Sequence, residues 1–212
     1  MGIFTVPTAN TAQSEGLDLI GAESISIQQL TTVAHQIRQI TRNAELQVLA
    51  RNTADLGIRL ERGSWCVAEC LAHLTQTTRS FVPPISDAIA KAPKLTRNRP
   101  LRTGILAGSL IRTLNPPYRI RFNVLPELVP QHTDIENAWT SFVESQSELI
   151  ETVRSAGGVA IDRVKIKSPV YARFSYNVYG AFRMLVAHES RHIWQIEQIL
   201  KALDSRPASG VA

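Results

Sequence analysis

The stretch AFRMLVAHESRHIWQIEQILKAL, residues 181–203, decides the fold, because its apolar residues recur every three or four positions. This spacing places them on one face of an α-helix. The face consists of Ala181, Leu185, His188, His192, Ile196, Ile199 and Leu203. Two histidines therefore occupy positions where a helix of a bundle normally buries aliphatic side chains. Because bundles build metal and cofactor sites from such positions, the stretch predicts a helix that contributes to both core and site.

Two earlier segments show the same helical spacing. The first begins after Ser24 or Ser26, either of which can cap it, and its stripe is Ile27, Leu30, Ala34, Ile37, Thr41, Ala44 and Val48. The second follows Gly63, with Ser64 as its predicted cap, and its inward residues are Val67, Cys70, Leu71, Leu74 and Phe81. Pro83-Pro84 is expected to kink or stop this helix, with a further helical piece at residues 85–90.

A third helix is predicted to start near Thr133, where Glu136 completes a capping box, and to end at Gly157-Gly158. Its stripe is Ile135, Ala138, Trp139, Phe142, Gln146, Leu149 and Val153. Between this helix and the last one, residues 159–176 alternate enough to form a short extended piece.

About 40 residues separate the second and third helices, and they contain one short amphipathic segment at residues 105–114. Four long helices with such a connection predict an all-α fold, a four-helix bundle with a long crossover between the second and third helices. The chain divides into a flexible leader (1–24), the bundle domain (25–204) and a C-terminal tail (205–212).

The composition is that of a globular domain, with 44% apolar and 19% charged residues. No stretch reaches membrane-spanning length and the leader lacks signal-peptide features, so we expect a cytoplasmic protein with no membrane partner. Cys66 and Cys70 lie four apart, a spacing that fits neither a redox pair nor a zinc ribbon. We interpret them as ordinary buried thiols.

The net charge of +5 is concentrated in residues 91–126, which hold eight basic residues and no acidic one. They are Lys91, Lys94, Arg97, Arg99, Arg102, Arg112, Arg119 and Arg121. The segment can be a solvated connection, a surface for an anionic small ligand, or a nucleic-acid surface. The first interpretation is favoured, and the absence of a nucleic-acid-binding motif disfavours the last.

The histidines carry the chemistry. His188 and His192 are four residues apart, so they lie one above the other on a helix, and His73 offers a third imidazole from the second helix. Three protein nitrogens leave the fourth position of a divalent ion open, as in catalytic zinc sites. Histidine pairs at this spacing also occur on solvated faces, so the spacing alone leaves both interpretations open.

Residues 188–192 also match the letters of HExxH, in which Glu189 would be a general base. The metzincin extension needs glycine and histidine where this chain has Gln195 and Gln198, which disfavours a protease. Glu189 stays a candidate proton-transfer group, and no other catalytic residue is assigned.

Three motifs together resemble the DinB-like, or YfiT-like, family of metalloenzymes. They are Ser64-Trp65 followed by Glu69-x-x-x-His73-Leu74, the basic crossover with Asn115-Pro-Pro-Tyr-Arg and Leu125-Pro, and the closing His188-x-x-Arg-His192-x-x-Gln195. The similarity covers about residues 26–204. It implies a four-helix bundle with a divalent ion, commonly nickel or zinc, held by His73, His188 and His192.

The resemblance also implies a function. The leading hypothesis is a metal-dependent transferase that acts on a small-molecule substrate with a low-molecular-weight thiol such as bacillithiol, mycothiol or glutathione. The alternatives are a hydrolase using metal-bound hydroxide, with Glu189 or Glu69 moving the proton, and a non-enzymatic metal-binding stress protein.

Three further residues are expected to lie near the histidines. Glu69 and Gln195 lie one turn from ligands and are expected to orient imidazole N–H groups, and Trp65 is expected to be a packing anchor at the mouth of the site. His35 and His132 match no motif.

Family members often pair as homodimers, and five apolar residues off the main stripes predict the same here. They are Leu46, Leu49, Phe174, Ile193 and Trp194.

Overall fold

The computed structural model describes residues 24–116, 118, 128–130, 134–171 and 173–205. Four long helices form the bundle, namely α1 (Ile25–Leu49), α3 (Val67–Ala90), α5 (Ile135–Ser155) and α6 (Val178–Asp204). Shorter elements are α2 (Thr53–Leu56), α4 (Ile105–Leu114) and an antiparallel pair of strands, β1 (Lys165–Lys167) and β2 (Ser175–Asn177). The predicted all-α fold is confirmed. The predicted leader and tail fall outside the described residues, except for Ser24 and Ser205 at their inner ends.

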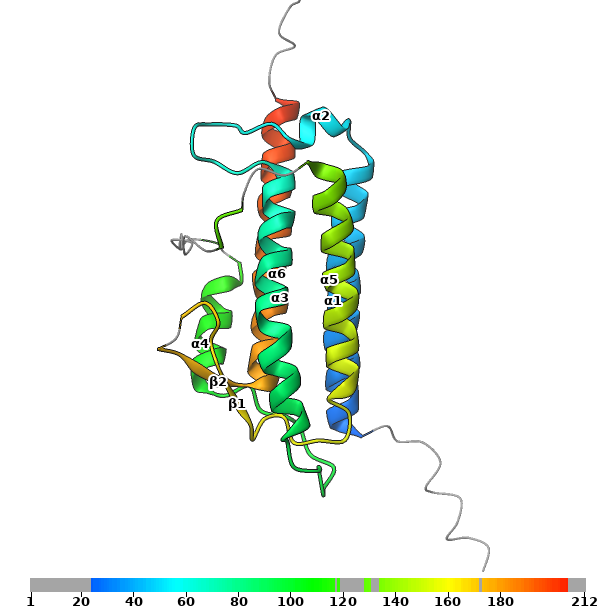
Figure 1. Cartoon of the computed structure of the whole chain (residues 1–212), viewed down its shortest axis with the longest axis vertical. Coiled ribbons are helices and arrows are strands. Elements are labelled where there is room, and N and C mark those ends of the chain that lie inside the picture. The colour runs from blue at the N-terminus through cyan, green and yellow to red at the C-terminus, as the bar shows by residue number, and fades with distance from the viewer. Residues whose placement is uncertain (1–23, 117, 119–127, 131–133, 172, 206–212) are drawn as a thin grey trace, which may run out of the picture.

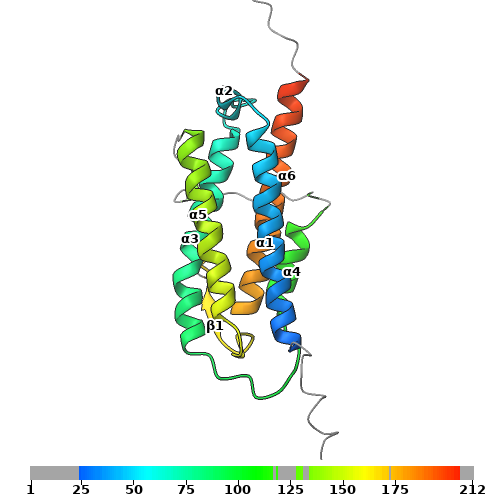
Figure 2. The ribbon, with the colours of Figure 1, turned by 90° about the vertical axis from the view of Figure 1, so that its right-hand side faces the viewer.

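The order of the helices around the bundle explains the long crossover. α1 packs against α5 and α6, and α3 packs against the same two helices, so α1 and α3 lie on a diagonal. Figures 1 and 2 show α1 and α6 running in one direction and α3 and α5 in the other. Because α3 and α5 are parallel neighbours, the chain between them must return along the length of the bundle.

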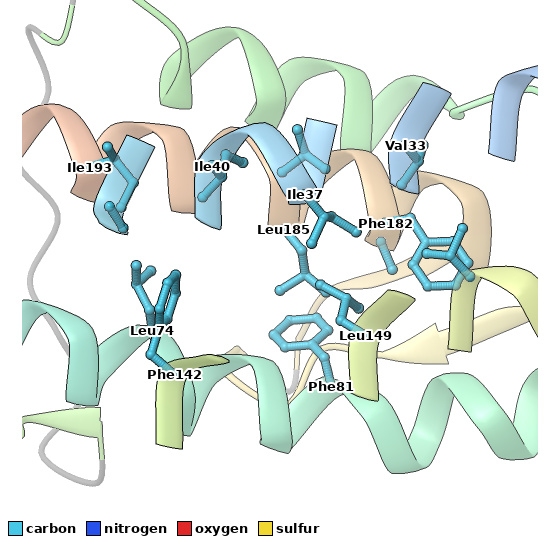
Figure 3. Packing of buried hydrophobic residues seen from close by; sticks show 14 of the residues in the cluster. Val33, Ile37, Ile40, Leu74, Phe81, Phe142, Leu149, Phe182, Leu185 and Ile193 are labelled. Carbon is cyan, nitrogen blue, oxygen red and sulfur yellow. The ribbon is translucent and has the colours of Figure 1, made fainter. Parts of the chain in front are cut away.

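The core fills the space between the four long helices (Figure 3). Each helix contributes aliphatic or aromatic side chains, among them Ile37, Phe81, Phe142 and Leu185, all of which are buried. Each such side chain stabilises the fold by about 1.5–3 kcal/mol. The stripe predicted for α3 is fully buried, whereas on α1 the outermost predicted residue, Ile27, is exposed.

The caps differ from the sequence predictions at two helices. Ser24 caps α1 as expected, accepting the Ile27 N–H at 3.3 Å. α3 starts at Val67 with Cys66 as its N-cap residue, because Ser64 instead closes a turn with Glu61. Asp134 caps α5 by accepting the Asn137 N–H, and the helix begins at Ile135, close to the predicted start; Thr133, the predicted first residue of the capping box, lies outside the described residues.

Pro83 and Pro84 do not stop α3, which continues as one helix to Ala90. The prediction of a stop, with a separate piece at residues 85–90, is therefore wrong. Phe81 and Ile85 on either side of the prolines are fully buried. The burial of each of these side chains contributes about 1.5–3 kcal/mol, which offsets much of the roughly 3 kcal/mol that each proline costs inside a helix.

The crossover is attached to one side of the bundle. In Figure 1, α4 and the two strands lie together beside α6 and α3, away from α1 and α5. Arg99, one of the basic residues, forms a two-point ion pair with Asp162 (2.6 and 2.8 Å), and the Gln29 side chain hydrogen-bonds both backbone groups of Leu101. Within the described residues, no helix is long and apolar enough to cross a membrane.

The contact between α4 and α6 depends on Gly180. A Cβ atom there would lie 2.6 Å from the Thr103 carbonyl oxygen and 2.7 Å from the Ala107 Cβ. We expect Gly180→Ala to lower the free energy of unfolding by about 1–3 kcal/mol, because overpacking outweighs the better helix propensity of alanine. Urea denaturation measures this change. Gly108→Ala on α4, where a Cβ meets nothing within 4 Å, is the control and should stabilise by about 0.5–1 kcal/mol. Equal effects of both substitutions would contradict the packing argument.

Candidate metal centre

The three predicted histidines come together between α3 and α6. His73 projects from α3, and His188 and His192 project from α6, which packs directly against it. One nitrogen from each ring lies within 4.8 Å of the other two. The Nε2 atoms of His73 and His188 are 3.3 Å apart. Nitrogens at this separation can share one ion, given metal–nitrogen bonds of about 2.0–2.1 Å.

Hydrogen bonding fixes the form of His73. Its Nδ1 lies 2.9 Å from the backbone oxygen of Leu128. A carbonyl oxygen only accepts, so Nδ1 carries the proton and donates it, and the neutral ring presents the Nε2 lone pair to the other histidines. The Nδ1 atoms of His188 and His192 are buried and have no hydrogen-bond partner among the described residues.

The three imidazoles are uncharged near neutral pH. Burial lowers the pKa of His73, and burial together with the nearby His73 and Arg191 lowers the pKa of His188 to about 3. Burial, with the two neighbouring histidines, also holds the pKa of His192 well below its ordinary value. Because metal ligands must be deprotonated, this environment suits a cation. The close approach of the Nε2 atoms of His73 and His188 also fits a shared divalent ion, because two neutral lone pairs at this distance gain from a cation between them.

Trp65 covers one side of the histidines. Its ring centroid lies 4.8 Å from that of His73 and 6.0 Å from that of His192, to which it is nearly parallel. Trp65 is half-buried and immediately precedes the N-cap of α3. This location agrees with its predicted role as a packing anchor at the mouth of the site.

Glu69 and Gln195 were both expected to orient the histidines, but in the structure they have different neighbours. The buried Glu69 carboxylate accepts the Cys66 N–H at 2.9 Å and pairs with Arg59, so its predicted contact with an imidazole is wrong. Glu69 instead holds the start of α3 and the preceding loop. Gln195 lines the same cavity as His192, and its interaction with that ring partly offsets the lowering of the His192 pKa.

The structure does not bring Glu189 to the histidines' cavity. Its buried carboxyl group accepts hydrogen bonds from Thr78 Oγ1 at 3.0 Å and Gln146 Nε2 at 3.1 Å, in the bundle core. Burial raises its pKa to about 7. Adjacent helical residues point in directions about 100° apart, which explains why Glu189 and His188 face different surroundings.

A cavity of about 960 Å³ opens beside the three histidines. It lies between α3 and α6 and is enclosed by α4, the strand pair and the loop before α3, and most of its lining is apolar or aromatic. Among the described lining residues, Arg191 is the one cation and Glu61 the one carboxylate. The Arg191 guanidinium lies 5.4 Å from the ring centroid of Tyr118.

The remaining candidates have no place in this cavity. Cys66 and Cys70 are free and buried, and burial raises the pKa of both thiols, so neither is a nucleophile at neutral pH. His35 is exposed on α1, and His132 lies outside the described residues. Sequence reasoning missed Thr77 and Tyr176, which line the cavity. The four-residue spacing from His73 to Thr77 is a signal that could have located the first of them.

A four-helix bundle with three convergent, uncharged histidines beside an open cavity defines a class of candidate metal-binding proteins. The model of the DinB superfamily matches residues 29–196, and the chain belongs to this family. Its fold is similar to that of YfiT from Bacillus subtilis, with a TM-score of 0.56 and 14% sequence identity over 87% of this chain and 93% of YfiT. YfiT is described as a probable metal-dependent hydrolase with an unusual four-helix bundle topology. Comparison with curated protein sequences gives no match.

The Arg59–Glu69 pair predicts a pH-dependent stability. Burial by itself would raise the pKa of Glu69, but hydrogen bonds from Arg59 and Cys66 outweigh it and lower the pKa. The stabilisation is therefore present above the ordinary pKa of 4.5 and is lost as pH falls through the lowered one. We expect Glu69→Gln to lower the free energy of unfolding by about 1–2 kcal/mol at pH 7, and by progressively less below pH 4.5.

Urea denaturation across this pH range measures the difference. Glu45→Gln, which removes an exposed ion pair with Arg42, is the matched control and should change stability by less than about 0.5 kcal/mol. A Glu69→Gln effect that does not vary with pH would contradict the assigned ion pair.

Proposed function

We propose that this protein is a divalent-metal-dependent transferase that acts with a low-molecular-weight thiol. His73, His188 and His192 would hold the ion, which we propose to be nickel or zinc. Three uncharged ligands leave the ion its full double charge, so a bound ion would lower the pKa of a thiol and favour the thiolate near neutral pH. The convergence of the three nitrogens supports the ion, and family membership supports its use in catalysis.

We choose a transferase over a hydrolase because the lining of the cavity is mainly apolar. Glu61 is the one carboxylate among the described lining residues, and it lies in the loop before α3. Hydrolysis by metal-bound hydroxide needs a group that carries the proton to the leaving oxygen or nitrogen. A thiolate that displaces a leaving group such as chloride needs no such proton transfer. The mainly apolar walls suit an apolar electrophile, and Arg191 suits the carboxylates of common cellular thiols.

A metal-dependent hydrolase is the second candidate, favoured by the description of YfiT. In that case Glu61, the one carboxylate among the described lining residues, is the candidate to move a proton. Glu189 is engaged in the core by Thr78 and Gln146, so we assign it no step in either reaction. A protein that only binds metal would show neither activity.

Metal content tests the ligands. We expect about one nickel or zinc ion per chain, and we expect His73→Ala, His188→Ala and His192→Ala each to abolish stoichiometric binding. Elemental analysis measures this, and thermal denaturation supplies a second measurement, since an ion present at 100 times its Kd stabilises the folded state by about 2.7 kcal/mol. His35→Ala on the exposed face of α1 is the control. Retention of metal by all three histidine variants would reject the site.

Activity assays separate the functions. We expect the metal-loaded protein to conjugate glutathione, bacillithiol or mycothiol to a chromogenic aryl chloride, and we expect the histidine variants to lose this activity. Metal-dependent cleavage of nitrophenyl esters or amides without conjugation would favour the hydrolase. Absence of both activities in fully loaded protein would leave metal binding as the function.

We further propose a homodimer in the cytoplasm. Leu46, Leu49 and Trp194 are 55%, 69% and 41% exposed, and exposed apolar residues of this size favour association. Ile193, expected to belong to the same surface, is buried instead. We expect sedimentation at micromolar concentration to give a dimer, and Leu49→Lys to weaken it at least tenfold. A wild-type protein that sediments only as the 23.5 kDa species would reject the dimer.

A further inference from the structure

The cavity continues along α3 beyond the histidines. His73, Thr77 and Phe81 follow one another at intervals of four residues, so they lie on one face of α3, and all three line the cavity. Tyr176 of β2 stacks on Phe81 with ring centroids 6.3 Å apart. β2, which carries Tyr176, lies with β1 and α4 beside α3 and α6 (Figure 1).

The Thr77 hydroxyl is exceptional among the buried threonines of the described helices, because it has no hydrogen-bond partner. Thr32, Thr41, Thr75 and Thr152 each donate to the carbonyl oxygen four residues earlier. Thr77 is 4% exposed, and its Oγ1 has no hydrogen-bond partner among the described residues. An unpartnered buried hydroxyl is destabilising, so its presence beside a cavity calls for a ligand.

A second unpartnered hydroxyl lies at the same end. Tyr176 is 3% exposed, and its hydroxyl has no partner of normal hydrogen-bond geometry among the described residues; the Ser168 hydroxyl is its near polar neighbour. Burial raises its pKa to about 12, an effect partly offset by the nearby Ser168 hydroxyl, so the group stays protonated and able to donate. Ser168 itself lines the cavity and accepts the N–H groups of Val170 and Tyr171.

The described residues that line this part of the cavity carry no charge: Ser168 is polar, and Phe81, Val170, Phe174, Met184 and Leu185 are apolar. Among the described residues, seven tryptophan, tyrosine and phenylalanine side chains line the cavity. A charged group placed at this end would lose hydration without gaining a partner, whereas an uncharged ring or chain with one polar atom would be accommodated.

We propose that Thr77 and Tyr176 form a recognition subsite for an uncharged, mainly apolar group that bears one hydrogen-bonding atom, as in a phenol, an alcohol or an amide. The subsite rests on the proposed function in one respect: it would hold the apolar electrophile while the histidines hold the ion. Thr77 is one helical turn from His73, which corresponds to about 5–6 Å between their Cβ atoms. The ligand's reactive atom therefore lies within a few bonds of its recognised polar atom.

Two probes of equal shape test the subsite. Para-ethylphenol and para-ethyltoluene differ in a hydroxyl against a methyl group, and calorimetric titration of the full chain gives the affinity for each. We expect a roughly three- to tenfold preference for the phenol. Thr77→Val combined with Tyr176→Phe should abolish that preference. The matched controls Thr75→Val and Tyr179→Phe remove hydroxyls that already have partners and should leave it unchanged.

Thermal stability of the same variants supplies an independent measurement. Because their hydroxyls are unpartnered, Thr77→Val and Tyr176→Phe should keep or raise the melting temperature, whereas both control substitutions should lower it. Equal affinities for the two probes, binding of neither, or a preference that survives the double substitution would overturn the subsite.

Titration of metal-free and nickel-loaded protein separates this proposal from the proposed function. A phenol preference that persists in a protein unable to bind metal would reject the proposed function and support the subsite. If the protein binds nickel stoichiometrically but its affinities for the two probes do not depend on Thr77 and Tyr176, the subsite alone is rejected.

Discussion

The close approach of His73 on α3 to His188 and His192 on α6 is the constraint on which the rest of the architecture depends. Their ring nitrogens meet only if these two helices are direct neighbours. α3 precedes α5 and runs parallel to it, so the connection between them must travel the length of the bundle (Figures 1 and 2). That long connection then supplies α4 and other residues that enclose the cavity beside the histidines.

Enclosing the histidines has an energetic consequence. Removal from water keeps the imidazoles uncharged but leaves the Nδ1 atoms of His188 and His192 without partners among the described residues. Such groups cost free energy, and the apolar core between the helices offsets that cost (Figure 3). The Arg99–Asp162 ion pair attaches the crossover to the segment after α5, and the absence of a side chain at Gly180 lets α4 approach α6. The enclosure is therefore built into the packing.

Periodicity predicted the helices and placed His188 and His192 on one face, whereas His73 was assigned to the same site through the resemblance to the DinB-like family. It could not predict features that depend on contacts between distant residues. Glu189 follows His188 directly, yet Thr78 and Gln146 engage it in the core. Pro83 and Pro84 are strong local signals against a helix, and burial of their neighbours prevails over them. The unpartnered state of Tyr176 can be recognised only once its strand is placed against α3.

Chemistry and recognition come from different kinds of element. The three histidines are held on α3 and α6, long helices with side chains fixed by core packing, which gives the precision that coordination requires. Much of the cavity wall comes from α4, the strand pair and the loop before α3, none of which belongs to the four-helix core. Substitutions at the cavity-facing residues of these elements can reshape the cavity while the packing among the four long helices is kept. This separation is compatible with a DinB-superfamily chain that shares the fold of YfiT at 14% sequence identity, because the four long helices preserve the fold while the elements around the cavity can vary.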